Sequence, residues 1–354
     1  MKALILLGGE GTRLRPLTMN SLKSMVPIAN KHFFEYQLKL LKKYKISEVV
    51  LSVCYLPDRI KHIIGTGRKY GMNIRYVIED QPLGTGGAVK NAELLLSDDF
   101  LVMNGDILTD VNLKKMMELH RKSNAIATLY LNEVDDPTSY GLVETDRGQR
   151  ITKFLEKPNW AEVKTKWINA GIYVFNRRIL TYIPAGKNYS LERGVFPETL
   201  KNGEKLMAYK TNAYWLDIGT LEKYMQANFD VLEQRLKVLP LILTKILRWN
   251  VRVGRKTNIS LGTFFRGPII IGDFCRIERG TFSPLTIIGN HCEIGRNCCV
   301  ERSIIWDNAK IGENVTIKNC IIGNNCEIQS NVVLHNSVVG DYTKITNSSR
   351  FEAL

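Results

Sequence analysis

The chain has 354 residues, and its 49 Lys and Arg against 35 Asp and Glu give a formal net charge of +14. With 44% hydrophobic and 24% charged residues, it has the composition of a folded globular protein, which excludes intrinsic disorder. The length suits two domains, and the basic balance leaves nucleic acid, an anionic membrane or small phosphorylated ligands as partners to consider. The apolar run Ala3–Leu7 is too short for a signal-peptide core or a membrane span. We therefore expect a cytoplasmic protein without a membrane partner.

The first 240 residues alternate between strand and helix patterns. Strands are predicted at Ala3–Leu7, Glu48–Val53, Asn73–Ile78 and Phe100–Met103, and helices at Phe33–Lys43, Pro57–Tyr70 and Gly86–Leu96. This alternation predicts an α/β fold with a parallel sheet flanked by helices, in which ligands bind beyond the carboxyl ends of the strands. Further strands are predicted at Ala125–Leu131, Gly141–Glu144, Ile151–Leu155, Ile168–Phe175 and Ala213–Leu216, before a long amphipathic helix over Thr220–Lys237.

After about residue 250 the sequence repeats with a period of 17 residues. Three apolar series share this spacing: Ile271, Ile288, Ile305, Ile322 and Val339; Ile277, Ile294, Ile311, Ile328 and Ile345; and Val300, Ile317 and Leu334. Apolar columns about six residues apart predict a triangular parallel β-helix of hexapeptide repeats, with one side of each coil a residue short. A glycine follows the first series in every coil except one, where Trp306 stands. We therefore expect two domains, residues 1–240 and 241–354.

Six of the seven cysteines lie in this repeat region. Three of them share a column of small residues with a period of 17: Cys275, Cys292, Ala309, Cys326 and Thr343. A buried free cysteine behaves as a small hydrophobic residue, and none of the six forms a CxxC pair. We therefore predict that these thiols pack in the interior and are kept reduced in the cytoplasm.

A glycine-rich and basic segment follows the first strand and reads Gly8-Gly9-Glu10-Gly11-Thr12-Arg13-Leu14. A Walker A loop would need Gly-Lys-Ser/Thr, and the dinucleotide fingerprint would need a third glycine at Leu14. Glycines let the backbone approach a ligand closely, and a fixed guanidinium such as Arg13 suits phosphate oxygens. Lys23 is a second cation close behind. The segment therefore predicts phosphate binding.

Two more strand-end loops carry candidate ligand groups. Gln81–Ala88 joins a strand to a helix, so its backbone amides are expected to point at a bound ligand. Asp106 and Asp217 each follow an apolar strand. Two carboxylates beside phosphate oxygens suit Mg²⁺, which prefers a few carboxylates together with phosphate and water. Asp106 and Asp217 are therefore the candidate metal ligands.

In combination, these segments resemble the sugar-1-phosphate nucleotidylyltransferases, also called sugar-nucleotide pyrophosphorylases. The likeness is greatest to the mannose-1-phosphate guanylyltransferases that carry a C-terminal left-handed β-helix. It covers essentially the whole chain, through the segments Gly8–Thr18, Lys23–Pro27, Leu83–Ala88, Asn104–Asp106, Ser139–Val143, Phe154–Pro158, Asn169–Tyr173 and Trp215–Gly219. The resemblance implies a Rossmann-like nucleotidyltransferase domain with a mixed sheet, followed by a left-handed parallel β-helix, and Mg²⁺ as the cofactor.

The resemblance also implies roles for individual residues. The catalytic residues would be Arg13, Lys23, Asp106, Lys157 and Asp217, with the two cations Arg13 and Lys23 on the triphosphate and Lys157 on the sugar phosphate. The nucleotide would be held by Leu6, Gly8, Gly9, Gly11, Thr12, Gln81, Gly84, Thr85 and Gly86. The sugar would be held by Gly141, Glu156, Asn169 and Gly171. The family usually has Pro-Lys-Pro where this chain has Leu22-Lys23-Ser24, so the loop around Lys23 is expected to be less rigid.

The implied substrates are small molecules, GTP and mannose 1-phosphate, which would give GDP-mannose and pyrophosphate. The Leu83–Gly87 loop and the Ser139–Val143 segment favour the guanylyl group, but glucose-1-phosphate thymidylyl- and uridylyltransferases share the same motifs and stay open as alternatives.

Two alternatives of another class remain. A bifunctional enzyme could use His291 or His335 of the β-helix for acyl transfer, and a regulatory subunit could bind sugar nucleotides without turnover. A regulatory subunit of that kind would be expected to lose a catalytic side chain, and all five are present here. The basic residues are scattered, so nucleic acid is not an expected partner. The flat sides and end coil of the β-helix predict a homo-oligomer.

Overall fold

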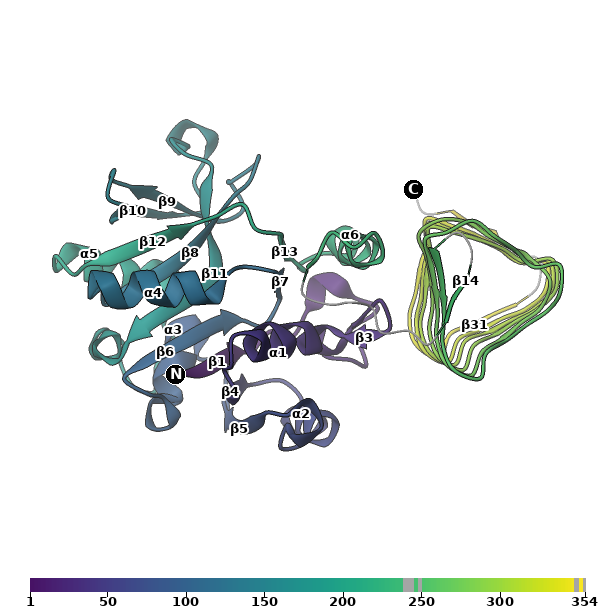
Figure 1. Ribbon diagram of the computed structural model, residues 1–354, viewed down its shortest axis with the longest axis horizontal. Coiled ribbons are helices and arrows are strands. Elements are labelled where there is room, and N and C mark those ends of the chain that lie inside the picture. The colour runs from purple at the N-terminus through teal and green to yellow at the C-terminus, as the bar shows by residue number, and fades with distance from the viewer. Residues whose placement is uncertain (238–244, 248–249, 347–349, 353–354) are drawn as a thin grey trace. The chain divides into compact units, whose positions relative to one another are not determined.

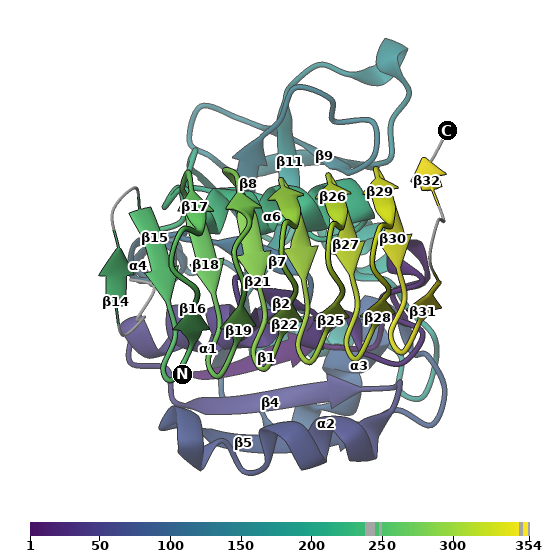
Figure 2. The same ribbon diagram turned by 90° about the vertical axis from the view of Figure 1, so that its right-hand side faces the viewer.

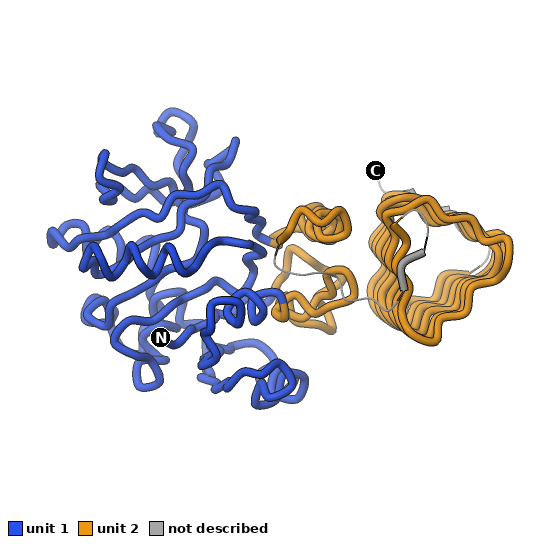
Figure 3. Tube along the Cα trace, in the orientation of Figure 1, with its two compact units in different colours: residues 1–10, 36–217 blue, residues 11–35, 218–354 orange. Residues whose placement is uncertain are grey.

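The computed structural model describes residues 1–237, 245–247, 250–346 and 350–352, and these form two compact units (Figure 3). Unit 1 consists of residues 1–10 and 36–217, and unit 2 of residues 11–35 and 218–354. The expected domain boundary at residue 240 falls within 238–244, outside the described residues. Unit 2 therefore contains the basic segment from the N-terminal part of the chain as well as the repeat region.

The centre of unit 1 is the parallel half of a nine-stranded sheet (Figure 1). Its strands lie in the order β6 (Asp99–Asn104), β1 (Lys2–Leu6), β4 (Glu48–Val53) and β5 (Asn73–Ile78). All neighbours in this group are parallel. Strand β1 is buried along its centre, as expected for a parallel strand covered on both faces. This half of the sheet confirms the strand positions predicted from the apolar runs.

The other half of the sheet is mostly antiparallel. Strand β11 (Trp167–Asn176) runs antiparallel to β6 and leads to β9 (Gly141–Thr145) and β10 (Ile151–Glu156). β8 (Ala127–Glu133) also pairs with β11, and β12 (Leu206–Lys210) pairs in parallel with β8. A parallel sheet throughout, as the strand and helix alternation predicts, is therefore wrong for this half. The mixed sheet implied by the family resemblance is confirmed.

The helices of the α/β region differ from the sequence expectation mainly at their ends. Helix α1 (Phe33–Lys43) is found where it was expected, whereas α2 (Pro57–Ile64) stops at Gly65, whose φ of 64° ends the helix. Helix α3 (Gly84–Asn91) and helix α6 (Leu221–Leu232) are also shorter than predicted. The remaining helices are α4 (Leu113–Ser123), which packs on β8, β11 and β12, and α5 (Phe196–Lys201).

The repeat region of unit 2 is a parallel β-helix with a triangular cross-section, seen end-on in Figure 1 and from the side in Figure 2. Its first sheet contains β14 (Lys245–Leu247), β15 (Val251–Val253), β18 (Ile269–Ile271), β21 (Thr286–Ile288), β24 (Ile304–Ile305), β27 (Ile321–Ile322) and β30 (Val338–Val339). Its second contains β16 (Asn258–Ile259), β19 (Arg276–Ile277), β22 (Glu293–Ile294), β25 (Lys310–Ile311), β28 (Glu327–Ile328) and β31 (Lys344–Ile345). Its third contains β17 (Phe264–Phe265), β20 (Thr281–Phe282), β23 (Cys299–Glu301), β26 (Thr316–Lys318), β29 (Val333–His335) and β32 (Arg350–Glu352).

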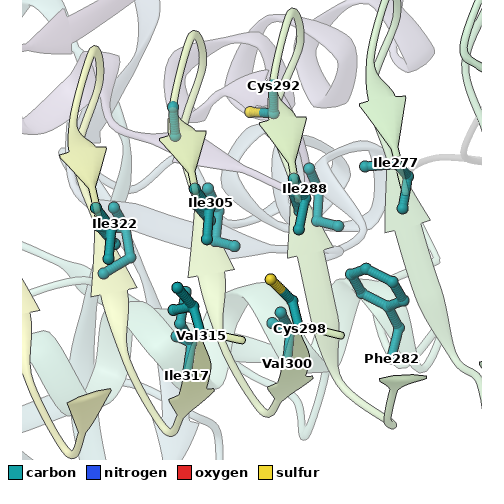
Figure 4. Packing of buried hydrophobic residues seen from close by; sticks show 14 of the residues in the cluster. Ile277, Phe282, Ile288, Cys292, Cys298, Val300, Ile305, Val315, Ile317 and Ile322 are labelled. Atoms are coloured by element: carbon teal, nitrogen blue, oxygen red, sulfur yellow. The ribbon is translucent and has the colours of Figure 1, made fainter. Parts of the chain in front are cut away.

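The three predicted apolar columns each lie in one of these sheets. Ile288 pairs with Ile305 and Ile305 with Ile322, so residues 17 apart are direct neighbours in adjacent coils. Their side chains stack in the interior (Figure 4). Burying one such side chain contributes roughly 1.5–3 kcal/mol, so the ladder as a whole stabilises the stack.

The corners and the thiols of the β-helix follow from the same repeat. At several corners the chain turns through a residue with positive φ, most often asparagine, which tolerates that conformation better than other side chains: Asn297, Asn308, Asn314, Asn319, Asn325, Asn331 and Asn336. Five free cysteines are buried inside: Cys275, Cys292, Cys298, Cys320 and Cys326. Cys299 is half-buried. The predicted packing role therefore fits these five thiols.

Two further parts of unit 2 come from outside the repeat. The basic segment contains short 3₁₀ turns at Thr12–Leu14 and Lys23–Met25 and a hairpin of β2 (Pro27–Ile28) and β3 (Lys31–His32). The other part is helix α6, whose first turn is capped by the Thr220 side chain. Across the described part of the chain, every helix is too short or too polar to span a bilayer.

Candidate active site

The carboxyl ends of β1 and β6 meet at the centre of the unit 1 sheet. Leu6 pairs with Asn104, and the Gly105 amide donates to the Leu6 carbonyl at 2.9 Å. A Cβ at Gly105 would lie 2.4 Å from that oxygen, so only glycine fits. The strand order places β4 and β5 on one side of β1 and β6 on the other, which is the switch point where open α/β sheets bind ligands.

Gly8 and Gly9 lie in the loop after β1 in surroundings that would accept a side chain. A Cβ at Gly9 would meet no atom within 4 Å, and one at Gly8 would make only ordinary contacts at 3.8 Å. Nothing in the described protein therefore requires glycine here, whereas close approach of a ligand would. Beneath the loop lies the buried Glu79, which accepts hydrogen bonds from Ser52 Oγ at 2.8 Å and from the Leu83 amide at 3.1 Å.

At the start of α3, close packing against the Tyr189 backbone explains why glycines are needed. The Gly86 and Gly87 amides donate to the Tyr189 carbonyl, at 2.8 and 3.0 Å. A Cβ at Gly84 would lie 2.8 Å from the same oxygen. The expectation that the amides of this loop point at a ligand is therefore wrong for Gly86 and Gly87, because the Tyr189 backbone already occupies them. Gln81, before the helix, is exposed.

The two candidate metal ligands come together through a short antiparallel ribbon. Strand β7 (Ile107–Thr109) pairs with β13 (Trp215–Asp217), and Asp217 lies opposite Ile107, the residue after Asp106. The ribbon thus brings the two aspartates, far apart in the sequence, to the same end. Buried Gln37 supports this end, since its Nε2 donates to the Asn104 carbonyl at 2.8 Å.

Tyr140 connects the aspartate end to the lysine proposed for the sugar phosphate. Its hydroxyl donates to Asp217 Oδ1 at 2.9 Å, and its carbonyl accepts from the Lys157 amide at 2.9 Å. Its ring lies edge-on to Trp215 at 5.5 Å. Lys157 has a φ of 51°, a strained conformation for a residue other than glycine. One tyrosine therefore fixes both an acidic and a basic candidate residue.

A second network links the α3 loop to the expected sugar-binding residues. Glu192, in the π-helical turn Leu191–Val195, accepts from the Thr85 hydroxyl at 2.7 Å and from the Tyr173 hydroxyl at 3.2 Å. The Asn169 amide donates to the Tyr173 hydroxyl at 2.8 Å, and Asn169 Oδ1 accepts from the Gly171 amide at 3.3 Å. A chain of hydrogen bonds thus runs from Thr85 to Gly171.

Glu156 lies beside this network and opposite Gly141 on the neighbouring strand. A Cβ at Gly141 would come within 2.9 Å of Glu156 Oε2, so the glycine leaves room for the carboxylate. Burial raises the pKa of Glu156, and the negative charge of Glu192 raises it further, against the opposing effect of Lys157 and Arg193. A carboxyl held in this way can accept or donate a hydrogen bond to a sugar hydroxyl.

The remaining candidate residues belong to unit 2. Gly11 has a φ of 69°, and its carbonyl accepts from the Thr18 hydroxyl at 2.7 Å. A Cβ at Gly11 would meet the Lys23 Cβ at 3.0 Å, so the two positions are packed together. Thr12 and Arg13 are exposed, and buried Leu14 anchors the turn that carries them. The segment therefore presents its cation from a turn with a fixed apolar base.

The acidic end of the β7–β13 ribbon fits a hard divalent cation. The described residues contain no cluster of three or more His, Cys, Asp or Glu side chains that could enclose a metal by themselves. Two carboxylates suit Mg²⁺, which usually completes its shell with water and phosphate oxygens from the substrate. Asp106 and Asp217 therefore fit an ion that binds together with a nucleotide.

The sequence motifs assigned no role to several residues that organise this site. They are Glu79 under the Gly8 loop, Tyr140 between Asp217 and Lys157, and the Tyr173–Glu192 pair. Tyr140 lies inside the Ser139–Val143 motif, so its position was marked although its role was not. Tyr173 likewise ends the Asn169–Tyr173 motif, whereas Glu79 and Glu192 lie outside every motif, because their importance comes from contacts between distant segments.

The match to known families agrees with this geometry. Residues 2–234 match the Nucleotidyl transferase family, and residues 248–351 match the EIF2B subunit epsilon LbH domain. The chain therefore belongs to the nucleotidyl transferase family, and it is an enzyme with an appended left-handed β-helix. Nucleotidyltransferases of this family generally use a divalent metal ion.

Individual enzymes and one solved structure are also similar to this chain. A mannose-1-phosphate guanylyltransferase of Mycobacterium tuberculosis is 37% identical over 281 residues, which cover 79% of this chain and 77% of the relative. A UTP–glucose-1-phosphate uridylyltransferase of Synechocystis is 34% identical over 299 residues, covering 79% and 76%. The crystal structure of HddC from Yersinia pseudotuberculosis is 31% identical, has a TM-score of 0.57, and covers 64% of this chain and 97% of HddC. HddC has also been crystallised with GMP-PN, with a TM-score of 0.55 and the same identity and coverage.

Proposed function

We propose that this enzyme transfers a guanylyl group from GTP to mannose 1-phosphate, giving GDP-mannose and pyrophosphate. Nucleotidyl transfer to a sugar 1-phosphate is the activity named for two relatives that are 37% and 34% identical to this chain. The observation that carries the proposal is the β7–β13 ribbon, which brings Asp106 and Asp217 together and ties Asp217 to Lys157 through Tyr140. Acidic groups for a metal and a basic group for a phosphate are thus held in one unit.

In the proposed reaction, a phosphate oxygen of the sugar 1-phosphate attacks the α-phosphorus of the nucleotide. A new P–O bond forms as the bond from the α-phosphorus to the bridging oxygen breaks, and pyrophosphate leaves from the opposite side. The phosphate dianion is already a competent nucleophile, so no proton transfer is needed. Catalysis then depends on positioning two anions that repel each other and on neutralising charge in the transition state.

Each group of candidate residues has a place in this scheme. We assign the triphosphate to Arg13 and Lys23 and the sugar phosphate to Lys157. Asp106 and Asp217 would hold Mg²⁺, which would reduce the repulsion between the two anionic substrates. The nucleotide is assigned to Leu6, Gly8, Gly9, Gly11, Thr12, Gln81, Gly84, Thr85 and Gly86, and the sugar to Gly141, Glu156, Asn169 and Gly171. Within the nucleotide set, Thr85 and Gly86 would act by holding the Tyr189–Leu191 backbone in place, since the Thr85 hydroxyl accepts from the Leu191 amide and the Gly86 amide donates to the Tyr189 carbonyl.

The choice of guanine and mannose is supported by the Mycobacterium tuberculosis mannose-1-phosphate guanylyltransferase, which is 37% identical, and by the HddC complex with GMP-PN. The second candidate is glucose-1-phosphate uridylyl transfer, because the Synechocystis enzyme covers an equal share of this chain at 34% identity. We also assign the protein to the cytoplasm, where its buried thiols would stay reduced, and propose self-association through the β-helix.

A substrate panel tests the proposal. GTP, UTP, dTTP, ATP and CTP are each combined with mannose, glucose or N-acetylglucosamine 1-phosphate and Mg²⁺, and pyrophosphate release is measured. We expect the highest kcat/KM for GTP with mannose 1-phosphate. A preference for UTP or dTTP with glucose 1-phosphate would establish the second candidate instead, and absence of pyrophosphate release with every pair would exclude both.

A further inference from the structure

Trp306 occupies a β-helix position that holds glycine in the other coils. In two of those coils an added Cβ would collide with the next coil: it would lie 2.5 Å from Asp307 Oδ1 at Gly289, and 2.6 Å from Asp341 Oδ1 at Gly323. Coil stacking therefore favours the smallest residue at this corner. Trp306 is nevertheless almost fully buried, at 2% exposure. Its large side chain must therefore be covered by something other than the repeat.

What covers it is helix α6. The Trp306 indole Nε1 donates to the Tyr224 hydroxyl at 2.8 Å, and the two rings meet edge to face with centroids 6.2 Å apart. The Tyr224 hydroxyl in turn donates to the Pro27 carbonyl at 2.7 Å. Burial raises the pKa of Tyr224, so its hydroxyl keeps the proton that it donates. These three residues form one relay from the β-helix to the basic segment, all within unit 2.

The relay ends on a strained hairpin. The turn between β2 and β3 consists of Ala29 and Asn30, with φ values of 46° and 63°. Hairpin turns of this kind prefer Asn and Gly, and alanine with positive φ costs roughly 1 kcal/mol. The turn is held by two side-chain bonds: Asn228 Oδ1 accepts from the Ala29 amide at 2.9 Å, and Asn30 Nδ2 donates to the Ile288 carbonyl at 2.7 Å. A strained conformation persists only where its surroundings fix it in this way.

The hairpin directly follows the turn that carries Lys23. The sequence of that turn does little to make it rigid, because Leu22 and Ser24 flank the lysine where the family usually has prolines. Buried Leu22 and Met25 anchor it, and the Val26 carbonyl accepts from the Phe33 amide at 3.0 Å. Fixing Pro27 therefore fixes the end of the short segment from which Lys23 projects.

We propose that Trp306 is a positioning residue for the nucleotidyl transfer reaction: through Tyr224 and Pro27, the β-helix holds the Lys23 segment in the conformation that binds the triphosphate. The inference rests on the proposed role of Lys23. It gives the β-helix a part in catalysis that is separate from self-association, and it explains why one coil departs from the glycine column.

The test removes hydrogen bonds of the relay while keeping an aromatic side chain at both positions. Trp306→Phe removes one hydrogen bond and is expected to lower kcat/KM for GTP about fivefold. Tyr224→Phe removes two and should lower it at least as much, with KM for mannose 1-phosphate unchanged in both variants. Since both variants break the same relay, the double variant should lose little more than Tyr224→Phe alone. The matched control is Arg302→Gln, because the Arg302 guanidinium lies 5.2 Å from the Phe229 ring and joins the same β-helix and helix without reaching the hairpin.

Binding of a non-hydrolysable GTP analogue completes the test. Trp306→Phe should weaken binding about fivefold in the natural background and leave it unchanged when Lys23 is already replaced by Ala. A lower unfolding temperature with unaltered kinetics and binding in both relay variants would overturn the proposal, as would an equal loss in the Lys23→Ala background. If Lys23→Ala itself binds the analogue and turns over normally, the role of Lys23 in the proposed function fails, which is a separate and visible result.

Discussion

The β-helix and the α/β unit of this enzyme distribute their contacts in opposite ways. In the β-helix each residue contacts the equivalent residue one coil away, as Ile288 does with Ile305, so the same interaction recurs along the stack. In unit 1 the important contacts are single and join distant segments, such as Tyr140 with Asp217 or Thr85 with Glu192. A substitution in the β-helix should therefore change stability in a graded way, whereas one in the site should remove activity without unfolding the protein.

The largest effect should come from a substitution at the acidic end of the β7–β13 ribbon, where we propose that the metal binds. Asp106→Asn removes a charge at the start of β7 while keeping the side-chain shape, and we expect turnover to fall by about 10³-fold or more, since charge stabilisation dominates such reactions. The thermal unfolding midpoint should change little. The control is Asp98→Asn, an exposed aspartate before the other end of the same β6 strand, which should keep full turnover. Near-normal pyrophosphate release by Asp106→Asn would show that the assignment is wrong.

A core substitution in the β-helix should have the opposite signature. Ile317 is fully buried, and Ile317→Ala should lower the free energy of unfolding by about 2–5 kcal/mol, because it removes buried methyl groups and leaves a cavity. Urea denaturation measures the loss, and kcat below the transition should be unchanged. Exposed Glu313 of the same coil gives the control, since Glu313→Ala should shift stability by less than about 0.5 kcal/mol. A loss of kcat in folded Ile317→Ala would break the contrast between the two regions.

Substitutions at Gly9 and Gly105 distinguish a glycine that a ligand would require from a glycine that packing requires. Gly9→Ala meets no neighbouring atom, so stability should stay within about 0.5 kcal/mol of the natural protein, while the added methyl should weaken nucleotide binding about tenfold. Gly105→Ala, whose Cβ would strike the Leu6 carbonyl, should instead lose stability. Thermal unfolding and titration with a GTP analogue distinguish the two. Unaltered affinity in Gly9→Ala would mean that the nucleotide does not approach this backbone.

The smallest effect concerns the pH dependence of stability. The folded protein raises the pKa of Glu156, so it binds this proton more tightly than the unfolded chain does. The resulting stability is complete below the ordinary glutamate pKa of about 4.3 and is lost as pH rises through the raised value. Glu156→Gln cannot ionise and should therefore be more stable than the natural protein at pH 7 to 8, with a smaller difference at pH 4. Exposed Glu118→Gln should show no such trend in urea denaturation across this range.

Much of this fold could be predicted because its signals are local or periodic. The strands β4 and β5 lie at the predicted residues, and the β-helix register follows directly from the period of 17. Helix α4 was missed although Asn112 caps it, with Oδ1 accepting from the Lys115 amide at 3.1 Å, and although its buried Leu113, Met116 and His120 follow at helical spacing. The glycines of the α3 loop were predicted to approach a ligand, and two of them instead bind the Tyr189 carbonyl through their amides. A glycine in a sequence indicates that another group approaches the backbone closely, but the sequence does not tell whether that group is a ligand or another part of the chain.

By itself, the sequence determined the family, the α/β catalytic part, the β-helix and the identity of the candidate site residues, since motifs and repeats are properties of neighbouring positions. Tertiary structure alone decided how those residues are joined. The pairing of β7 with β13, the link from Asp217 to Lys157 through Tyr140, and the relay from Trp306 to Pro27 all connect segments with no local signal for one another. The physical reason is that a buried donor needs an acceptor, which can come from any segment that the fold brings near. The residues around the donor in the sequence therefore do not predict which acceptor it will bind.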